Sequence, residues 1–86
     1  MNKAYAIMVC HAKFVGIPSC RTEVHSTKEK ADTAFQRLTS EIVEAYQDDI
    51  YSKVIENSPY CLLIRTDYGD CGSSYVLVKN TEIQVQ

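Results

Sequence analysis

Four cysteines and two histidines are the residues of this chain that could hold a metal ion or act as nucleophiles. None of them forms a C-x-x-C or H-x-x-x-H pair, the spacing that lets two ligands from one turn grip a single zinc ion. The sequence therefore predicts neither a metal site nor a cofactor. The six residues are Cys10, His11, Cys20, His25, Cys61 and Cys71.

The cysteines are expected to be free thiols. An even number in a short chain indicates disulfides when a protein is exported. No signal peptide is evident, because the apolar run 4–10 is interrupted at His11 and Lys13 and no small-residue cleavage site follows. The sequence thus favours a reducing, cytoplasmic compartment, although Cys10 and Cys20 could face each other across a first hairpin.

A cysteine nucleophile needs a neighbouring histidine or a helix N-terminus to stabilise its thiolate. Cys20 is the best placed, because His25 ends the same expected strand and a helix begins at Ser26. Cys20 and His25 differ by an odd number of positions, however, so on a regular strand they point to opposite faces. No catalytic residue is predicted, and we expect the protein not to be an enzyme.

Two groups of carboxylates have simpler interpretations than catalysis or metal binding. Asp48 and Asp49 are adjacent, so they diverge on a helix and are typical of a solvated helix end. The segment 67–72 superficially resembles a calcium-binding turn but lacks the further ligands and terminal glutamate of an EF-hand loop. Its composition favours an ordinary turn.

Tyrosines give the strongest indication of a contact surface, since tyrosine supplies contact area with a polar tip and is enriched at protein interfaces. Tyr46 and Tyr75 can be explained as core residues, whereas Tyr51 and Tyr68 are harder to bury. Combined with the neighbouring acids, they define a predicted partner-binding patch. Its members are Glu44, Asp48, Asp49, Tyr51, Asp67, Tyr68 and Asp70.

Charge is unevenly distributed along the 86 residues, whose net charge is −2. Residues 1–40 hold six bases and three acids, and residues 41–86 hold three bases and eight acids. A nucleic-acid binder normally shows a dense basic stripe, which this chain lacks, so direct nucleic-acid binding is not expected. The acidic half favours a partner protein with a basic surface.

One long helix is the clearest element. Ser26-x-x-Glu29 has the form of a capping box, and apolar residues then recur at three- and four-residue steps, which predicts a helix over about 27–47. Ile50, Val54 and Ile55 keep helical spacing, which predicts a kink near Asp48 and a short second helical segment.

Four further segments are expected to form an antiparallel sheet. They alternate with turn formers and give the order β-β-α-β-β, with the helix packed on one face of a small α+β sheet. Asn80 marks a turn before a frayed extra edge strand over 81–85. The four main strands are expected at 3–11, 19–25, 60–66 and 74–79.

These features predict one α+β domain over 1–86, too thin to house a deep catalytic pocket. No segment approaches the roughly 18 apolar residues of a membrane helix, so no membrane contact is expected. In size, scattered cysteines and lack of a catalytic motif, the chain resembles the short accessory proteins of phages and mobile elements. That resemblance implies a cytoplasmic inhibitor or regulator that binds a larger host protein, one with a nucleic-acid groove for example. The alternatives are a homodimeric small-ligand or nucleotide-binding module, and a thiol- or metal-dependent function.

Overall fold

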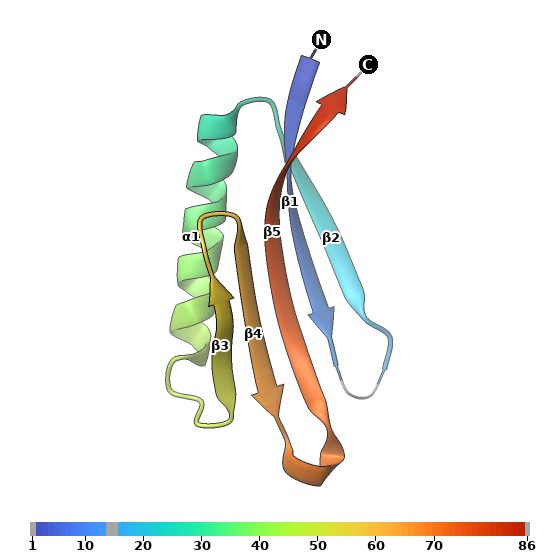
Figure 1. Cartoon of the computed structure of the whole chain (residues 1–86), viewed down its shortest axis with the longest axis vertical. Coiled ribbons are helices and arrows are strands. Elements are labelled where there is room, and N and C mark those ends of the chain that lie inside the picture. Colours follow the sequence, from blue (N-terminus) through green and yellow to red (C-terminus); the bar gives the residue numbers. More distant parts are fainter. Residues whose placement is uncertain (1, 14–15, 86) are drawn as a thin grey trace.

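The computed structural model describes residues 2–13 and 16–85, which form a five-stranded antiparallel sheet with one α-helix and a single 3-10 turn, η1 (Gly69–Cys71) (Figure 1). The antiparallel sheet with its helix agrees with the predicted α+β class, but the order is β-β-α-β-β-β, one strand more than the sequence predicts. The strands lie in the order β2-β1-β5-β4-β3. The elements are β1 (Asn2–Ala12), β2 (Ser19–His25), α1 (Lys28–Tyr46), β3 (Ser52–Asn57), β4 (Cys61–Asp67) and β5 (Ser73–Val85).

Helix α1 begins one residue later than the capping box predicts. Thr27 has an extended backbone and is the N-cap; its hydroxyl accepts a hydrogen bond from the amide of Lys30 at 3.2 Å. The predicted cap, Ser26, lies outside the helix. The apolar stripe is as expected, with Ala31 and Phe35 buried against the sheet. Within the described residues no helix combines the length and apolarity needed to cross a membrane.

The core lies between α1 and the three central strands. Antiparallel register places Val9 opposite Val78, and Val78 opposite Leu62, so every second residue of these strands faces the helix. Burial of this continuous apolar layer is the main force that holds the helix on the sheet. The fully packed cluster is Ile7, Val9, Phe35, Leu62, Ile64, Val76 and Val78.

The predicted second helical segment is wrong, because residues 52–57 form the edge strand β3. The strand pairs with β4 from Ser52 opposite Thr66 to Asn57 opposite Leu62. A register shift between Val54 and Glu56 marks a bulge at Ile55. The bulge breaks the alternation of side chains that identifies a strand.

The predicted turn at Asn80 is also wrong, since β5 runs without interruption from Ser73 to Val85. The amide of Asn80 donates to the carbonyl of Tyr60 at 2.9 Å. Its side-chain amide donates to Asp32 Oδ1 on the helix, also at 2.9 Å. Asn80 therefore joins the strand to the helix instead of ending the strand.

The expectation of free thiols is wrong for two of the cysteines. Cys10 and Cys20 are direct partners in the β1–β2 register, with Cα atoms 4.1 Å apart, and they form a disulfide. The antiparallel hairpin brings the two side chains to the same face of the sheet. Cys61 is a free, half-buried thiol.

Candidate functional site

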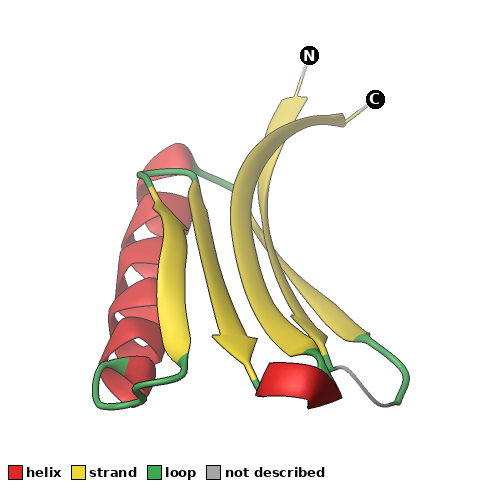
Figure 2. Cartoon of the chain, turned by 60° about the horizontal axis from the view of Figure 1, so that its bottom comes forward, coloured by secondary structure: helices red, strands yellow, loops and turns green. Residues whose placement is uncertain are grey.

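Two loops meet at one end of the molecule and carry most of the predicted patch. Both the α1–β3 loop and the β4–β5 loop lie at the lower end in Figures 1 and 2. The amide of Asp67 donates to the carbonyl of Tyr51 at 3.0 Å, which joins the loops directly. We call this surface the acidic end and define it as Asp48, Asp49, Tyr51, Asp67, Tyr68 and Asp70.

Two carboxylates of the acidic end hold its loops in place. Asp49 Oδ1 accepts the amide of Tyr51 at 2.9 Å, and its Oδ2 accepts the hydroxyl of Ser52 at 3.0 Å. Asp67 Oδ1 accepts the hydroxyl of Ser73 at 2.5 Å across the second hairpin. These are local bonds of the kind that Asp makes in turns, so both carboxylates have a structural role.

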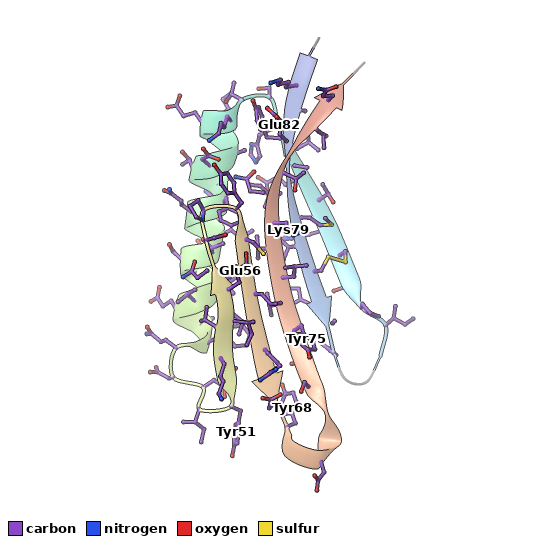
Figure 3. All side chains as sticks on the ribbon, in the orientation of Figure 1. Tyr51, Glu56, Tyr68, Tyr75, Lys79 and Glu82 are labelled. Atoms are coloured by element: carbon purple, nitrogen blue, oxygen red, sulfur yellow. A yellow bond between two sulfur atoms is a disulfide. The ribbon has the colours of Figure 1, made fainter. Side chains whose placement is uncertain are left out.

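Two other carboxylates point into solvent. Asp48 and Asp70 are exposed, and within residues 2–13 and 16–85 no hydrogen bond or ion pair engages either of them. Tyr51 is 61% exposed and Tyr68 is 46% exposed, so aromatic surface is exposed in the same two loops as these charges. Both tyrosines are labelled in Figure 3. The acidic end thus offers both charge and apolar area to a partner.

Ile50 belongs to the same surface but is missing from the predicted patch. It lies between Asp49 and Tyr51 in the α1–β3 loop and is 85% exposed. Its spacing from Val54 predicts a helix instead of an exposed loop. Its position between a loop carboxylate and an exposed tyrosine is the local signal that could have identified it.

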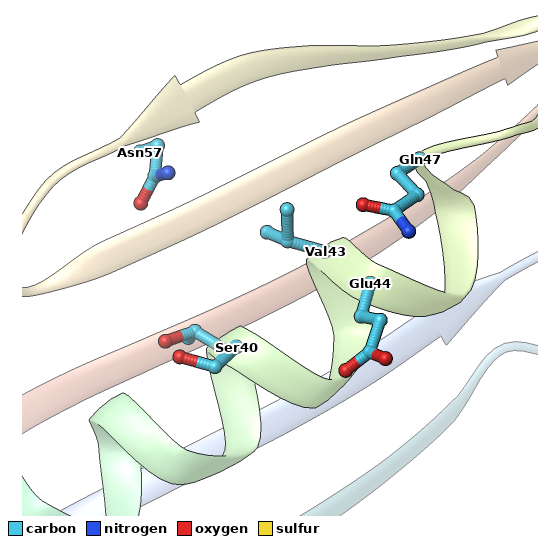
Figure 4. Close-up of a pocket in the computed structure, with 6 residues that line it drawn as sticks. Ser40, Val43, Glu44, Gln47 and Asn57 are labelled. Atoms are coloured by element: carbon cyan, nitrogen blue, oxygen red, sulfur yellow. The ribbon is translucent and has the colours of Figure 1, made fainter.

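Glu44, the remaining predicted residue, lies in the last turn of the helix. It lines a groove of about 460 Å³ between α1 and β3 together with Gln47 and Asn57 (Figure 4). The groove is open, because one helix cannot cover five strands. Glu44 is therefore adjacent to the acidic end without forming part of its two loops.

One cation reduces the negative charge of the acidic end. Arg65 Nε lies 3.3 Å from Asp67 Oδ2, close enough for an ion pair, although no hydrogen bond satisfies this buried atom. The pair neutralises Asp67. Asp48, Asp49 and Asp70 carry the remaining negative charge of the surface.

A cavity of about 340 Å³ lies beside the acidic end, where β1 finishes. Its lining includes the aromatic rings of Tyr46, Tyr68 and Tyr75 and the basic side chains of His11 and Lys13. Of the two tyrosines explained as core residues, Tyr46 packs on the core, whereas Tyr75 is 41% exposed.

Thiol and metal chemistry receive no geometric support from the described residues. Burial raises the pKa of the Cys61 thiol, and the nearby Glu56 carboxylate raises it further, so the thiol is protonated at neutral pH. Cys20 is bonded to Cys10 in the disulfide, so it is not a free thiol. His25 Nε2 lies 2.7 Å from Glu23 Oε1. Among residues 2–13 and 16–85, no three His, Cys, Asp or Glu side chains converge to hold a metal ion.

No protein-family model, curated protein or solved structure matches this chain.

Proposed function

We propose that this protein is a non-enzymatic binding protein whose acidic end docks on the basic surface of a larger protein. Docking on a cationic groove would exclude nucleic acid from that groove, which makes the chain an inhibitor or regulator. In this proposal the chain acts as a phage or mobile-element accessory protein that blocks a host factor.

One observation carries this proposal: two loops, distant in sequence, are fixed to each other and present unpaired carboxylates beside exposed tyrosines. The bond between Asp67 and Tyr51 and the internal bonds of Asp49 hold the loops in one arrangement. A surface ordered before binding loses less conformational entropy when it docks. Exposed tyrosine beside unpaired carboxylate is a composition that suits the core and rim of a protein interface.

Affinity capture with matched charge variants tests the proposal. The double variant Asp48→Asn/Asp70→Asn removes two exposed carboxylates from the acidic end. The control, Glu29→Gln/Glu41→Gln, removes two exposed carboxylates from the helix. Captured proteins are then purified, and the complex is rebuilt from pure components at low and high salt.

We expect the wild type and the control to bind one basic-surfaced protein stoichiometrically and more weakly at high salt. The double variant is expected to bind it about tenfold or more weakly, because two attractive charges are lost at the interface. A lack of any stoichiometric partner, or equal binding by the double variant, would contradict the proposal.

A second candidate, a small-ligand site, is favoured by the cavity at the end of β1. Its volume of about 340 Å³ lies within the range of ligand pockets. Tyr46 and Tyr68 offer rings for stacking, Lys13 offers positive charge to an anionic group, and His11 offers an imidazole ring beside it, a composition that suits a nucleotide. We expect a nucleotide panel to raise the melting temperature of the wild type but not of Lys13→Ala; no shift in the wild type excludes this candidate.

A further inference from the structure

The face of the sheet that points away from α1 is bare. Helix-side residues such as Ile7 and Val78 are at most 1% exposed, whereas their neighbour Met8, on the other side, is 38% exposed. The molecule is a thin slab, with Cα extents of 49 × 25 × 15 Å, because only one layer of helix covers the sheet. We call this bare side the open face.

Large apolar side chains are exposed on the open face. Met8 on β1 and Val24 on β2 are 38% and 60% exposed, and Tyr75 and Ile83 on β5 are 41% and 38% exposed. Leu77 is half-buried between them. Apolar side chains gathered on one bare face of a sheet usually mark an interaction surface.

Charge divides the open face into two halves. On β1 and β2 every described residue that points to this face is uncharged, and the Cys10–Cys20 disulfide ties the two strands together. The charged residues lie on the other three strands and comprise three cations and two carboxylates; Glu56 and Lys79 are labelled in Figure 3. These are Lys79 on β5, Arg65 and Asp67 on β4, and Lys53 and Glu56 on β3.

This distribution favours a second copy of the chain as the occupant. Interface cores are depleted in charged residues, and their rims are polar. When two copies pack around a two-fold axis, the uncharged halves cover each other and the charged halves remain at the rim. With three cations and two carboxylates, the rim is close to neutral, so copies do not repel one another. A strongly basic partner would find no excess of negative charge on the open face, and it fits the acidic end instead.

The open face also has the size that a stable dimer needs. Strands lie about 4.8 Å apart and rise about 3.3 Å per residue, so five strands of 6 to 13 residues present roughly 700 Å². A standard specific interface buries about 800 Å² on each partner. The whole open face is therefore comparable to one side of such an interface, with β1 and β2 as its core and the three charged strands as its rim.

We propose that two copies of this chain pack open face against open face, with β1 and β2 at the centre, as a four-layer sandwich of helix, sheet, sheet and helix. The two sheets then lie about 10 Å apart and bury the exposed side chains of Met8 and Val24. This inference goes beyond the proposed function, because the dimer is centred on β1 and β2 and leaves the two loops of the acidic end available to a partner.

Sedimentation over a dilution series, from millimolar to sub-micromolar protein, tests the dimer with a matched pair of variants. Val24 and Val54 are both on edge strands and are 60% and 50% exposed, but they point to opposite faces of the sheet. We compare Val24→Lys and Met8→Lys with the control Val54→Lys. Circular dichroism checks that each variant is folded.

We expect the wild type to dissociate from dimer to monomer on dilution. Val24→Lys and Met8→Lys should raise the dissociation constant at least about tenfold, whereas Val54→Lys should leave it unchanged. If Met8→Lys fails to fold, the comparison between Val24→Lys and Val54→Lys decides the test. A wild type that is a single chain at millimolar concentration, or equal weakening by Val54→Lys, would overturn the inference. The acidic-end variant Asp48→Asn/Asp70→Asn should dimerise like the wild type, so failure of the proposed function is distinguishable from failure of the dimer.

Discussion

The thiol of Cys61 lies on the open face beside Lys79, its direct partner on β5, and near the carboxylate of Glu56. Burial disfavours the thiolate, and so does the negative charge of Glu56; both raise the pKa of the thiol. Lys79 acts in the opposite direction but more weakly. At the scale of one residue, the structure thus makes Cys61 a poor nucleophile near neutral pH.

Alkylation of Cys61 should respond to its two charged neighbours with opposite signs. In a Cys71→Ser background at high dilution, we expect Glu56→Gln to speed the reaction at pH 7.5 and Lys79→Gln to slow it, because only the thiolate reacts. The rate for the parent protein should still be rising above pH 8.5, where an ordinary thiol is half ionised. Rates followed by mass spectrometry check this; a faster Lys79→Gln variant would contradict the assignment.

The N-cap of α1 lies one residue beyond its predicted position. The sequence predicts a capping box at Ser26, but the hydroxyl of Thr27 accepts the amide of Lys30. Both residues are good caps, so sequence alone cannot choose between them. The backbone decides, because Thr27 is extended while Lys28 is already helical.

Replacing the true cap should cost stability, and replacing its neighbour should not. We expect Thr27→Ala to lower the free energy of unfolding by about 1 kcal/mol, since an amide of the first turn loses its partner. Ser26→Ala should change it by less than about 0.5 kcal/mol. Urea unfolding of both variants measures these losses. A larger loss of stability for Ser26→Ala than for Thr27→Ala would show that Ser26, as in the predicted capping box, is the true cap.

The β1–β2 hairpin is an element whose stability should depend on its disulfide. Cys10 and Cys20 are ten positions apart, and crosslinking so short a loop restricts the unfolded chain by about 3 kcal/mol. We expect reduction, or Cys10→Ser/Cys20→Ser, to lower the free energy of unfolding by about that amount. A Cys61→Ser variant should show the same loss on reduction; an oxidised wild type no more stable than the reduced protein would contradict the prediction.

Some elements were predictable from sequence because their evidence is local. The alternation of Ser19–His25 and the three- and four-residue apolar steps of α1 each repeat within one segment. Strand β3 was missed because the bulge at Ile55 interrupts its alternation, leaving a short run that also fits a helix. The continuity of β5 beyond Asn80 depends on its pairing with β1 at the other end of the chain, which no local pattern contains.

The candidate site was predictable in composition but not in geometry. Exposed tyrosines and acids can be identified from residue type, and Tyr51 and Tyr68 are indeed exposed. Their closeness depends on the pairing of β3 with β4, and β3 itself was missed. The structural roles of Asp49 and Asp67 also follow from bonds that form only when the loops fold.

At the scale of the whole molecule, one helix on five strands leaves different surfaces available for different contacts. The acidic end is polar and formed by loops, and the open face is formed by strands and is uncharged in its β1–β2 half. Asp67 is common to both surfaces, but the other five residues of the acidic end lie in the two loops outside the open face. The proposed partner and the proposed second copy can therefore bind at the same time. The small core thus leaves much of the molecule's surface available for contacts.

Hydrogen exchange of the reconstituted complex with the captured partner tests the proposed docking most directly. We predict that the partner slows exchange most in residues 48–51 and 67–70, and that the helix surface around Glu29 and Glu41 is unchanged. Protection confined to other surfaces, with the amides of both loops exchanging as in the free protein, would contradict the assignment of the acidic end as the docking surface.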